Sequence, residues 1–178
     1  SVTKSVVSLL IGLAVEQGFV RSEEQSIGAF LSTVVDTIES DKAALTIRHL
    51  LTMSSGLDWQ ESGGAVTEYN AWTGSPDQIK YVLDKAFVAQ PGQLFNYNSG
   101  TSHLLSVIVM HSSGMSTADF AYKYLFEPIG IGRRGWLVDK QGFNYGSAGV
   151  SLRADDMVKI GNLVANRGVY EGKQIVSS

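Results

Sequence analysis

Apolar residues recur at helical spacing along much of the chain, and the residues that flank each stretch are those that start or stop helices. The first stretch contains Val2, Val6, Leu9, Leu10 and Leu13. Gly18 follows it, at a position where a left-handed cap ends a helix. We therefore expect a long helix from about Val2 to Gln17.

The same reasoning predicts further helices, each with its own start or stop residue. They cover residues 47–51 after a Thr46 cap, about 75–88 after a Ser75 cap, a buried stretch around 104–109, about 116–126 before Pro128, and about 154–166 before Gly168. The last of these has one apolar face, formed by Met157, Ile160, Leu163 and Val164. Strand signals are short, around 135–138 and 174–176. Because the chain has no repeat or linker, we expect a single, mostly helical domain.

Composition and charge narrow the classes of partner. The 178 residues are 44% hydrophobic and 17% charged, with a formal net charge of -3. A mildly acidic chain without basic clusters lacks the positive surface that nucleic-acid binding requires, which excludes nucleic acid as a partner. The longest apolar stretch, Val6 to Val15, is shorter than the roughly 20 residues of a membrane span. Cysteine is absent, and no leader pattern opens the chain, so its compartment stays open.

Common motifs for metals and nucleotides give no site. The histidines His49, His103 and His111 have no metal-ligand spacing, so we expect no bound metal. Each is expected to pack or hydrogen-bond within its own helix. The stretch from Gly130 to Gly135 matches G-x-G-x-x-G but follows a helix rather than a strand, which predicts a glycine-rich turn.

A candidate catalytic pair lies at the start of the first helix. Ser1-Val2-Thr3-Lys4 has the S-x-x-K pattern, which puts the Ser1 hydroxyl and the Lys4 amine one turn apart on the same face. A serine hydroxyl is a weak nucleophile until a base takes its proton, and a lysine whose charged form is destabilised can be that base. By itself, the pattern fits a serine cap followed by a solvated lysine equally well.

Five ordered segments give this pair a context. They are 1–12 with S-x-x-K, 47–57 with a leucine-rich helix and a Ser-Gly-Leu turn, 91–100 with a Pro-Gly turn before Tyr97-Asn98-Ser99, 126–130, and 149–156. With these segments the chain resembles the penicillin-recognising serine hydrolases, the superfamily of class C β-lactamases, DD-peptidases and related esterases and amidases. The resemblance implies their α+β fold, in which a helical region flanks an antiparallel sheet.

The resemblance also implies roles for individual residues. Ser1 would be the acylated nucleophile and Lys4 its proton acceptor, while Tyr97 would pass protons to the leaving group and activate water for deacylation. Such a centre needs no cofactor and no metal. Its partner would be a small ester, amide or peptide substrate.

The chain departs from the family pattern in two places. Ser99 stands where the second motif usually has Asn, so a shorter hydroxyl replaces the amide that would contact substrate and Lys4. This favours an esterase or amidase, including amidases of aminohexanoate oligomers, over β-lactam turnover. The third motif, Lys-Thr-Gly or its His and Arg variants, does not occur. We therefore expect residues 1–178 to be one partial domain, truncated before that motif and lacking much of the sheet and the second oxyanion donor.

Three alternatives stay open at this point. The protein could bind penicillin or peptidoglycan as a sensor without turning it over, or the segment could be inactive by itself. Ser1 could also act as an amino-terminal nucleophile with its own α-amine as base, although such sites usually open a strand rather than a helix. The sequence predicts no oligomeric state, and the family implies a bacterial periplasmic or extracellular location.

Overall fold

The structure is a computed structural model that describes residues 1–61 and 67–177. Its elements are, in chain order, α1 (Val2–Glu16), α2 (Gly28–Leu31), α3 (Ser40–Ala43), α4 (Ile47–Leu51), α5 (Glu68–Gly74), α6 (Gln78–Leu83), α7 (Ser99–Ser113), α8 (Thr117–Ala121), η1 (Tyr122–Phe126), η2 (Glu127–Ile129), α9 (Ala154–Ala165), β1 (Val169–Tyr170) and β2 (Lys173–Gln174). The turn η1 is π-helical and η2 is a 3₁₀ turn. The described residues are therefore mostly helical, as predicted.

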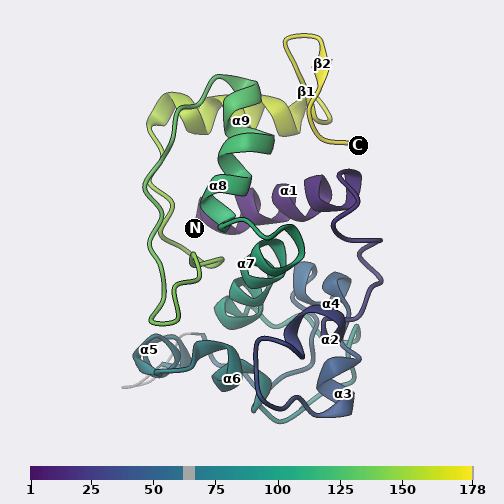
Figure 1. Ribbon diagram of the computed structural model, residues 1–178. Coiled ribbons are helices and arrows are strands. Elements are labelled where there is room, and N and C mark those ends of the chain that lie inside the picture. The colour runs from purple at the N-terminus through teal and green to yellow at the C-terminus, as the bar shows by residue number, and fades with distance from the viewer. Residues whose placement is uncertain (62–66, 178) are drawn as a thin grey trace.

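Helix α7 is the centre of the assembly. Helices α1, α4, α6 and α8 pack against it, and it crosses the middle of the molecule in Figure 1. Its residues from Ser99 to Val109 are all buried, so polar side chains on it need partners inside the protein. One of them, Ser106, donates its hydroxyl hydrogen to the carbonyl oxygen of Asn144 at 2.7 Å. Because residues 99–109 are buried, the amino-terminal end of α7 is held firmly in place.

Helix α1 matches the predicted range and packs along α7. Ser1 is its N-cap and accepts a hydrogen bond from the Thr3 amide at 3.3 Å. The side chains of Val6, Leu10 and Ala14 are fully buried on the face toward the core. Gly18 has φ of +77°, the left-handed conformation predicted for the end of this helix.

The helix predicted over 75–88 is wrong in its start and its length. Ser75 is the C-cap of α5, an element that the spacing does not predict, and Asp77 caps α6 instead by accepting from the Lys80 amide at 2.8 Å. Helix α6 ends at Leu83 because the following chain pairs with another segment. The Asp58 amide donates to Ala86 O at 2.8 Å, and Phe87 forms an isolated antiparallel bridge with Leu57.

The last two predicted helices hold with local changes. Helix α8 begins after Ser116 as expected, but the backbone continues through η1 and η2 and ends at Gly130, two residues beyond Pro128. On α9, Ile160 and Leu163 are buried, whereas Met157 is 46% exposed and Val164 is 56% exposed. The predicted apolar face of α9 is therefore only half covered by the described residues.

The carboxyl-terminal half has little regular strand. The predicted strand at 135–138 consists of isolated bridges, Trp136 to Val150 and Val138 to Asn144. Of the strand predicted at 174–176, Gln174 alone lies in β2, which pairs antiparallel with β1; this pair lies with α9 at one end of the molecule (Figure 1). The loop of residues 130–153 passes beside the amino terminus, where the Val150 amide donates to Thr3 Oγ1 at 3.4 Å.

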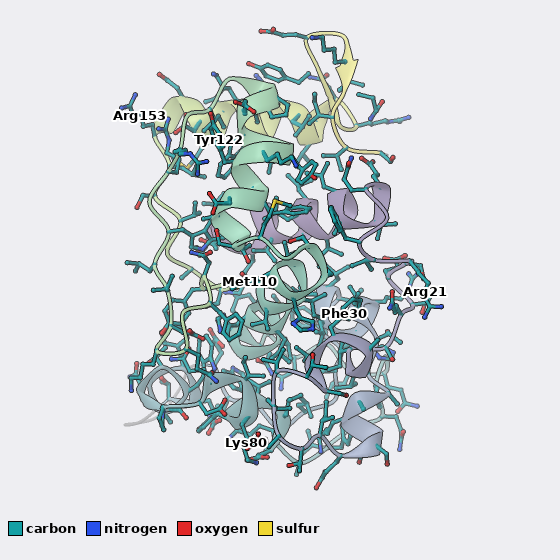
Figure 2. All side chains as sticks on the ribbon, viewed as in Figure 1. Arg21, Phe30, Lys80, Met110, Tyr122 and Arg153 are labelled. Atoms are coloured by element: carbon teal, nitrogen blue, oxygen red, sulfur yellow. The ribbon has the colours of Figure 1, made fainter. Side chains whose placement is uncertain are left out.

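Charged and apolar side chains are separated as expected for a folded domain. Figure 2 shows Arg21, Lys80 and Arg153 at the periphery, whereas Phe30, 6% exposed, lies toward the interior. Over the described ranges, none of the helices has both the length and the apolar character needed to cross a membrane.

The histidines follow the prediction at one position and depart from it at two. His49 bonds within the start of its own helix, where its Nδ1 accepts from the Thr46 amide at 3.2 Å. His111 contacts Thr33 Oγ1 at 2.7 Å. His103 is fully buried and bonds to Asp139, a residue of a distant loop, at 2.9 Å. The last two bonds cross between elements because α7 is surrounded by other segments.

Candidate active site

The amino termini of two helices meet at the candidate site. Ser1 caps α1, and Asn98 caps α7 by accepting from the Thr101 amide at 2.9 Å. The predicted residues Lys4 and Ser99 lie in the first turns of these helices, and Tyr97 lies directly before the Asn98 cap. Helix amino termini carry partial positive charge, so this junction favours groups that develop negative charge.

Lys4 lies at the centre of the predicted residues. Its Nζ donates to Ser99 Oγ at 3.1 Å and to the carbonyl oxygen of Ser147 at 2.9 Å. The same nitrogen lies 5.0 Å from the centroid of the Tyr97 ring, within cation–π distance. The structure thus brings Lys4, Tyr97 and Ser99 together, and it adds the Ser147 carbonyl, which the sequence does not indicate.

The Ser1 hydroxyl has a different partner from Lys4. Its Oγ donates to Thr3 Oγ1 at 3.1 Å and accepts from the Thr3 amide. Thr3 is fully buried and also receives the Val150 amide, so it links Ser1 to the loop beside the amino terminus. For Ser1 to give its proton to Lys4, the hydroxyl has to rotate away from Thr3.

Tyr97 is held by the turn before it and is 40% exposed. The Asn96 amide donates to Met53 O at 2.8 Å, and the Gly92 amide donates to Ser54 O at 2.7 Å. The Pro-Gly turn and the Ser-Gly-Leu turn, far apart in the sequence, are therefore joined by backbone hydrogen bonds. This pairing presents the phenol ring to the Lys4 amine while one side of it stays accessible to solvent.

Glu61 is a site residue that sequence reasoning missed. Its Oε2 accepts from the Ser99 amide at 3.0 Å and from Trp59 Nε1 at 2.6 Å. Its Oε1 accepts from the Ser99 hydroxyl. The residue lies in a loop and belongs to no recognisable motif, so only the folded chain brings it to the start of α7.

The Ser147 carbonyl is held in place from behind by His103 and Asp139. The Gly146 amide donates to His103 Nδ1 at 3.3 Å, so the ring proton lies on Nε2 and is donated to Asp139. A Cβ at Gly146 would collide with the backbone oxygen of Ser102, so only glycine lets the loop come this close to α7. The His103 ring thereby fixes the loop that supplies an acceptor to Lys4.

The Asp139 carboxylate is stabilised inside the protein. Burial alone would raise the pKa of its carboxyl group, but hydrogen bonds from His103 and from the amides of Phe143 and Gln141 outweigh burial and lower that pKa. Asp139 therefore stays charged at neutral pH and holds the His103 ring in one orientation.

The side chains of the site are suited to proton transfer. It combines a hydroxyl, an amine, a phenol and a carboxylate within a chain of contacts. In the part of the chain that the structure describes, no group of three or more His, Asp or Glu side chains is arranged to hold a metal ion. The side chains present could activate a hydroxyl for attack on a carbonyl carbon.

Sequence comparison identifies a family that matches this arrangement. The Beta-lactamase family model matches residues 1–175. A 6-aminohexanoate-dimer hydrolase from Paenarthrobacter ureafaciens is 21% identical, and the match covers 99% of this chain and 47% of that protein. The chain thus spans about half the length of this curated relative.

Solved structures share the fold. One described as a candidate 6-aminohexanoate-dimer hydrolase from Bacillus anthracis has a TM-score of 0.82 at 22% identity, covering 99% of this chain and 49% of that one. A penicillin binding protein from Bacillus halodurans has a TM-score of 0.73 at 18% identity, covering 100% of this chain and 61% of that one. These matches confirm the expected β-lactamase and DD-peptidase-like fold. With a family model that matches nearly every residue, the chain belongs to the Beta-lactamase family.

Proposed function

We propose that this chain carries the acyl-enzyme centre of a serine hydrolase that acts on an ester or an amide. Ser1 is the nucleophile, Lys4 accepts its proton, and Tyr97 transfers protons to the leaving group and from water. The observation that carries the proposal is the position of Lys4: the residue is one turn of α1 from Ser1, and its Nζ lies 5.0 Å from the Tyr97 ring centroid.

Acylation begins with rotation of the Ser1 hydroxyl from Thr3 toward Lys4. The neutral Lys4 amine takes the hydroxyl proton while Oγ forms a bond to the substrate carbonyl carbon, which gives a tetrahedral intermediate. The leaving group then departs with its electron pair and takes a proton from the Tyr97 hydroxyl. The Lys4 ammonium beside the ring stabilises the phenolate that results.

Deacylation reverses these transfers with water in place of the leaving group. The Tyr97 phenolate takes a proton from water, whose oxygen attacks the acyl carbon of the Ser1 ester. When the Ser1–acyl bond breaks, Lys4 returns its proton to Ser1 Oγ and the acid product leaves. No external oxidant, metal or cofactor is required for this balance.

The substrate class follows from two considerations. The relative from Paenarthrobacter ureafaciens is named a 6-aminohexanoate-dimer hydrolase, and this name supports an amide or ester substrate here. The Ser99 hydroxyl is shorter than the amide that a family member usually has at this place, and this favours an esterase or amidase over a β-lactamase.

The test is Ser1→Ala in the full-length protein. We expect a fluorophosphonate probe to label the wild-type protein at Ser1 and to leave the variant unlabelled. Hydrolysis of a p-nitrophenyl ester should fall by roughly 10⁴- to 10⁶-fold, the range for loss of a serine nucleophile. Ser8→Ala is the matched control, because the exposed Ser8 hydroxyl only donates to Ser5 O within the same helix.

The outcomes separate the alternatives. Unchanged hydrolysis by Ser1→Ala, or probe attached at another residue, rejects the proposal. A Ser1 adduct that forms with penicillin and never hydrolyses identifies a sensor. Activity that disappears when the Ser1 α-amine is acetylated or extended, with the hydroxyl intact, identifies an amino-terminal nucleophile.

A further inference from the structure

The start of α7 carries an acidic group whose role the proposed mechanism does not include. The Glu61 carboxylate accepts three hydrogen bonds, two from Ser99 and one from Trp59. Both donor residues are buried, with Ser99 1% and Trp59 4% exposed. A carboxylate that receives three hydrogen bonds at a helix amino terminus is fixed in place as an acceptor.

The loop that carries Glu61 is fixed on both sides. Asn96 Nδ2 donates to Trp59 O at 2.9 Å, which ties the loop to the segment that presents Tyr97. On α7, a Cβ at Gly100 would lie 3.0 Å from the Trp59 ring and 2.5 Å from Val82, so only glycine leaves room for the indole. These contacts set the distance between Glu61 and Ser99.

The direction of the hydrogen bonds follows from the number of protons. A serine hydroxyl has one hydrogen, and an ionised carboxylate can only accept. The Ser99 hydroxyl therefore donates its hydrogen to Glu61 Oε1, and the Ser99 oxygen is left to accept from Lys4 Nζ at 3.1 Å. The contacts form one directed chain, from Lys4 through Ser99 to Glu61.

We propose that Glu61 is a positioning residue that holds Ser99 as an acceptor for Lys4, so that Ser99 orients the base and donates nothing to the substrate. This inference rests on the proposed function of the site. It assigns Ser99 a role other than the substrate contact that the sequence analysis expects. A structural role alone, closing the first turn of α7, would need only the bond from the Ser99 amide.

Glu61→Gln reverses this chain with little change in shape. The variant's amide oxygen can still accept from the Ser99 amide and Trp59, while its NH₂ donates to the Ser99 oxygen. The Ser99 hydrogen then loses its acceptor and turns toward Lys4 or the substrate. We expect kcat for a p-nitrophenyl ester to fall roughly 10- to 100-fold, the scale for a misplaced catalytic group, with KM within about twofold.

A double-mutant cycle with Ser99→Ala tests whether Glu61 acts through Ser99. If it does, kcat of the double variant equals that of Ser99→Ala, since the hydroxyl that Glu61 orients is gone. Independent effects that multiply in the double variant overturn the proposal. A rise in KM at unchanged kcat in Ser99→Ala also overturns the proposal, because it indicates that Ser99 binds substrate.

Glu68→Gln is the matched control. Its carboxylate is also partly buried and accepts from Lys85 and from Tyr81 Oη at 3.1 Å, but these partners do not lead to Lys4. We expect its kcat to match the wild type, and unfolding midpoints of all variants show whether each remains folded.

Failure of the proposed function gives a separate result. If the wild-type protein is not labelled at Ser1, kcat values of the variants can no longer be compared. Crystal structures of the wild type and Glu61→Gln then test whether Glu61 positions Ser99. The proposal then requires that the contact between Lys4 Nζ and Ser99 Oγ is present in the wild type and lost in the variant. A contact retained in both structures overturns it.

Discussion

Two carboxylates bind to α7 one helical turn apart, and their surroundings differ. Glu61 binds Ser99 and two N–H donors, while Asp139 binds His103 and two backbone amides. The Asp139 pair ends in the core, where both side chains have no exposed surface. The Glu61 pair continues to Lys4 and to the partly exposed Tyr97.

The difference shows that the number of hydrogen bonds does not distinguish a carboxylate in the core from one at the proposed active site. Each carboxylate accepts three, and each contacts α7. What differs is the route to Lys4: the Glu61 contacts reach it through the Ser99 side chain, whereas the Asp139 contacts reach it through the backbone of Gly146 and Ser147. Both chains converge on Lys4, because His103 fixes Gly146 and the next residue, Ser147, supplies the second acceptor.

Lys4→Ala removes the group at which the two chains meet and should have the largest effect. We expect ester hydrolysis to fall by roughly 10²- to 10⁴-fold, the range for loss of a general base. The urea unfolding midpoint should change little, because Lys4 is only partly buried. If Lys4→Ala kept its activity but lost stability, the roles of the two regions would be reversed. Lys4→Arg is the control, because it keeps the charge.

His103→Ala tests the buried pair. The variant removes a donor from a buried carboxylate and leaves a cavity against Trp72 and Tyr145, whose rings lie within 5.5 and 5.3 Å of the imidazole. We expect the free energy of unfolding to fall by about 3 kcal/mol, measured in urea. His111→Ala is the comparison, since its ring bonds to Thr33 at the surface. Equal losses in both variants would contradict a special role for the buried pair.

Acid gives the smallest and most selective effect. Because hydrogen bonds lower the pKa of the folded Asp139 carboxyl, its charge stabilises the protein above the ordinary value of 3.8, and this contribution is lost as pH falls through the folded value. We expect the free energy of unfolding to decrease below about pH 5, with a shallower decrease in Asp139→Asn.

An exposed carboxylate provides the control for this measurement. Hydrogen bonds from Arg133 and Ser116 also lower the pKa of Asp119, but both side chains of the Arg133 pair are more than half exposed. Asp119→Asn should therefore leave the acid dependence nearly as it is in the wild type. A larger change in Asp119→Asn than in Asp139→Asn would show that burial does not set the effect.

The sequence predicts the helical frame because helices depend on local spacing and caps. Helix α1, the Thr46 cap of α4 and the left-handed Gly18 all follow from residues within a few positions of each other. The error at Ser75 is of the same local kind, since Asp77 offers an equally good cap two residues later. Local rules could not choose between them.

The candidate site is only half predictable for a related reason. The spacing of Ser1 and Lys4 is local, and Tyr97 follows from the resemblance, but Glu61 and Asp139 reach α7 from loops 38 and 36 residues away. Such loops carry no periodic signal, and single acidic residues in them are common. Their partners become evident only when Gly100 and Gly146 let the loops approach the helix.

In the proposed mechanism, the two acceptors around the Lys4 nitrogen also set the direction from which it takes a proton. A neutral amine keeps two hydrogens and one lone pair, and Ser99 Oγ and Ser147 O can each hold one of those hydrogens in place. The lone pair then occupies a valence that neither acceptor faces. A hydroxyl that approaches this lone pair can be deprotonated without breaking the hydrogen bonds to Ser99 and Ser147. The nitrogen is therefore oriented before the reaction begins.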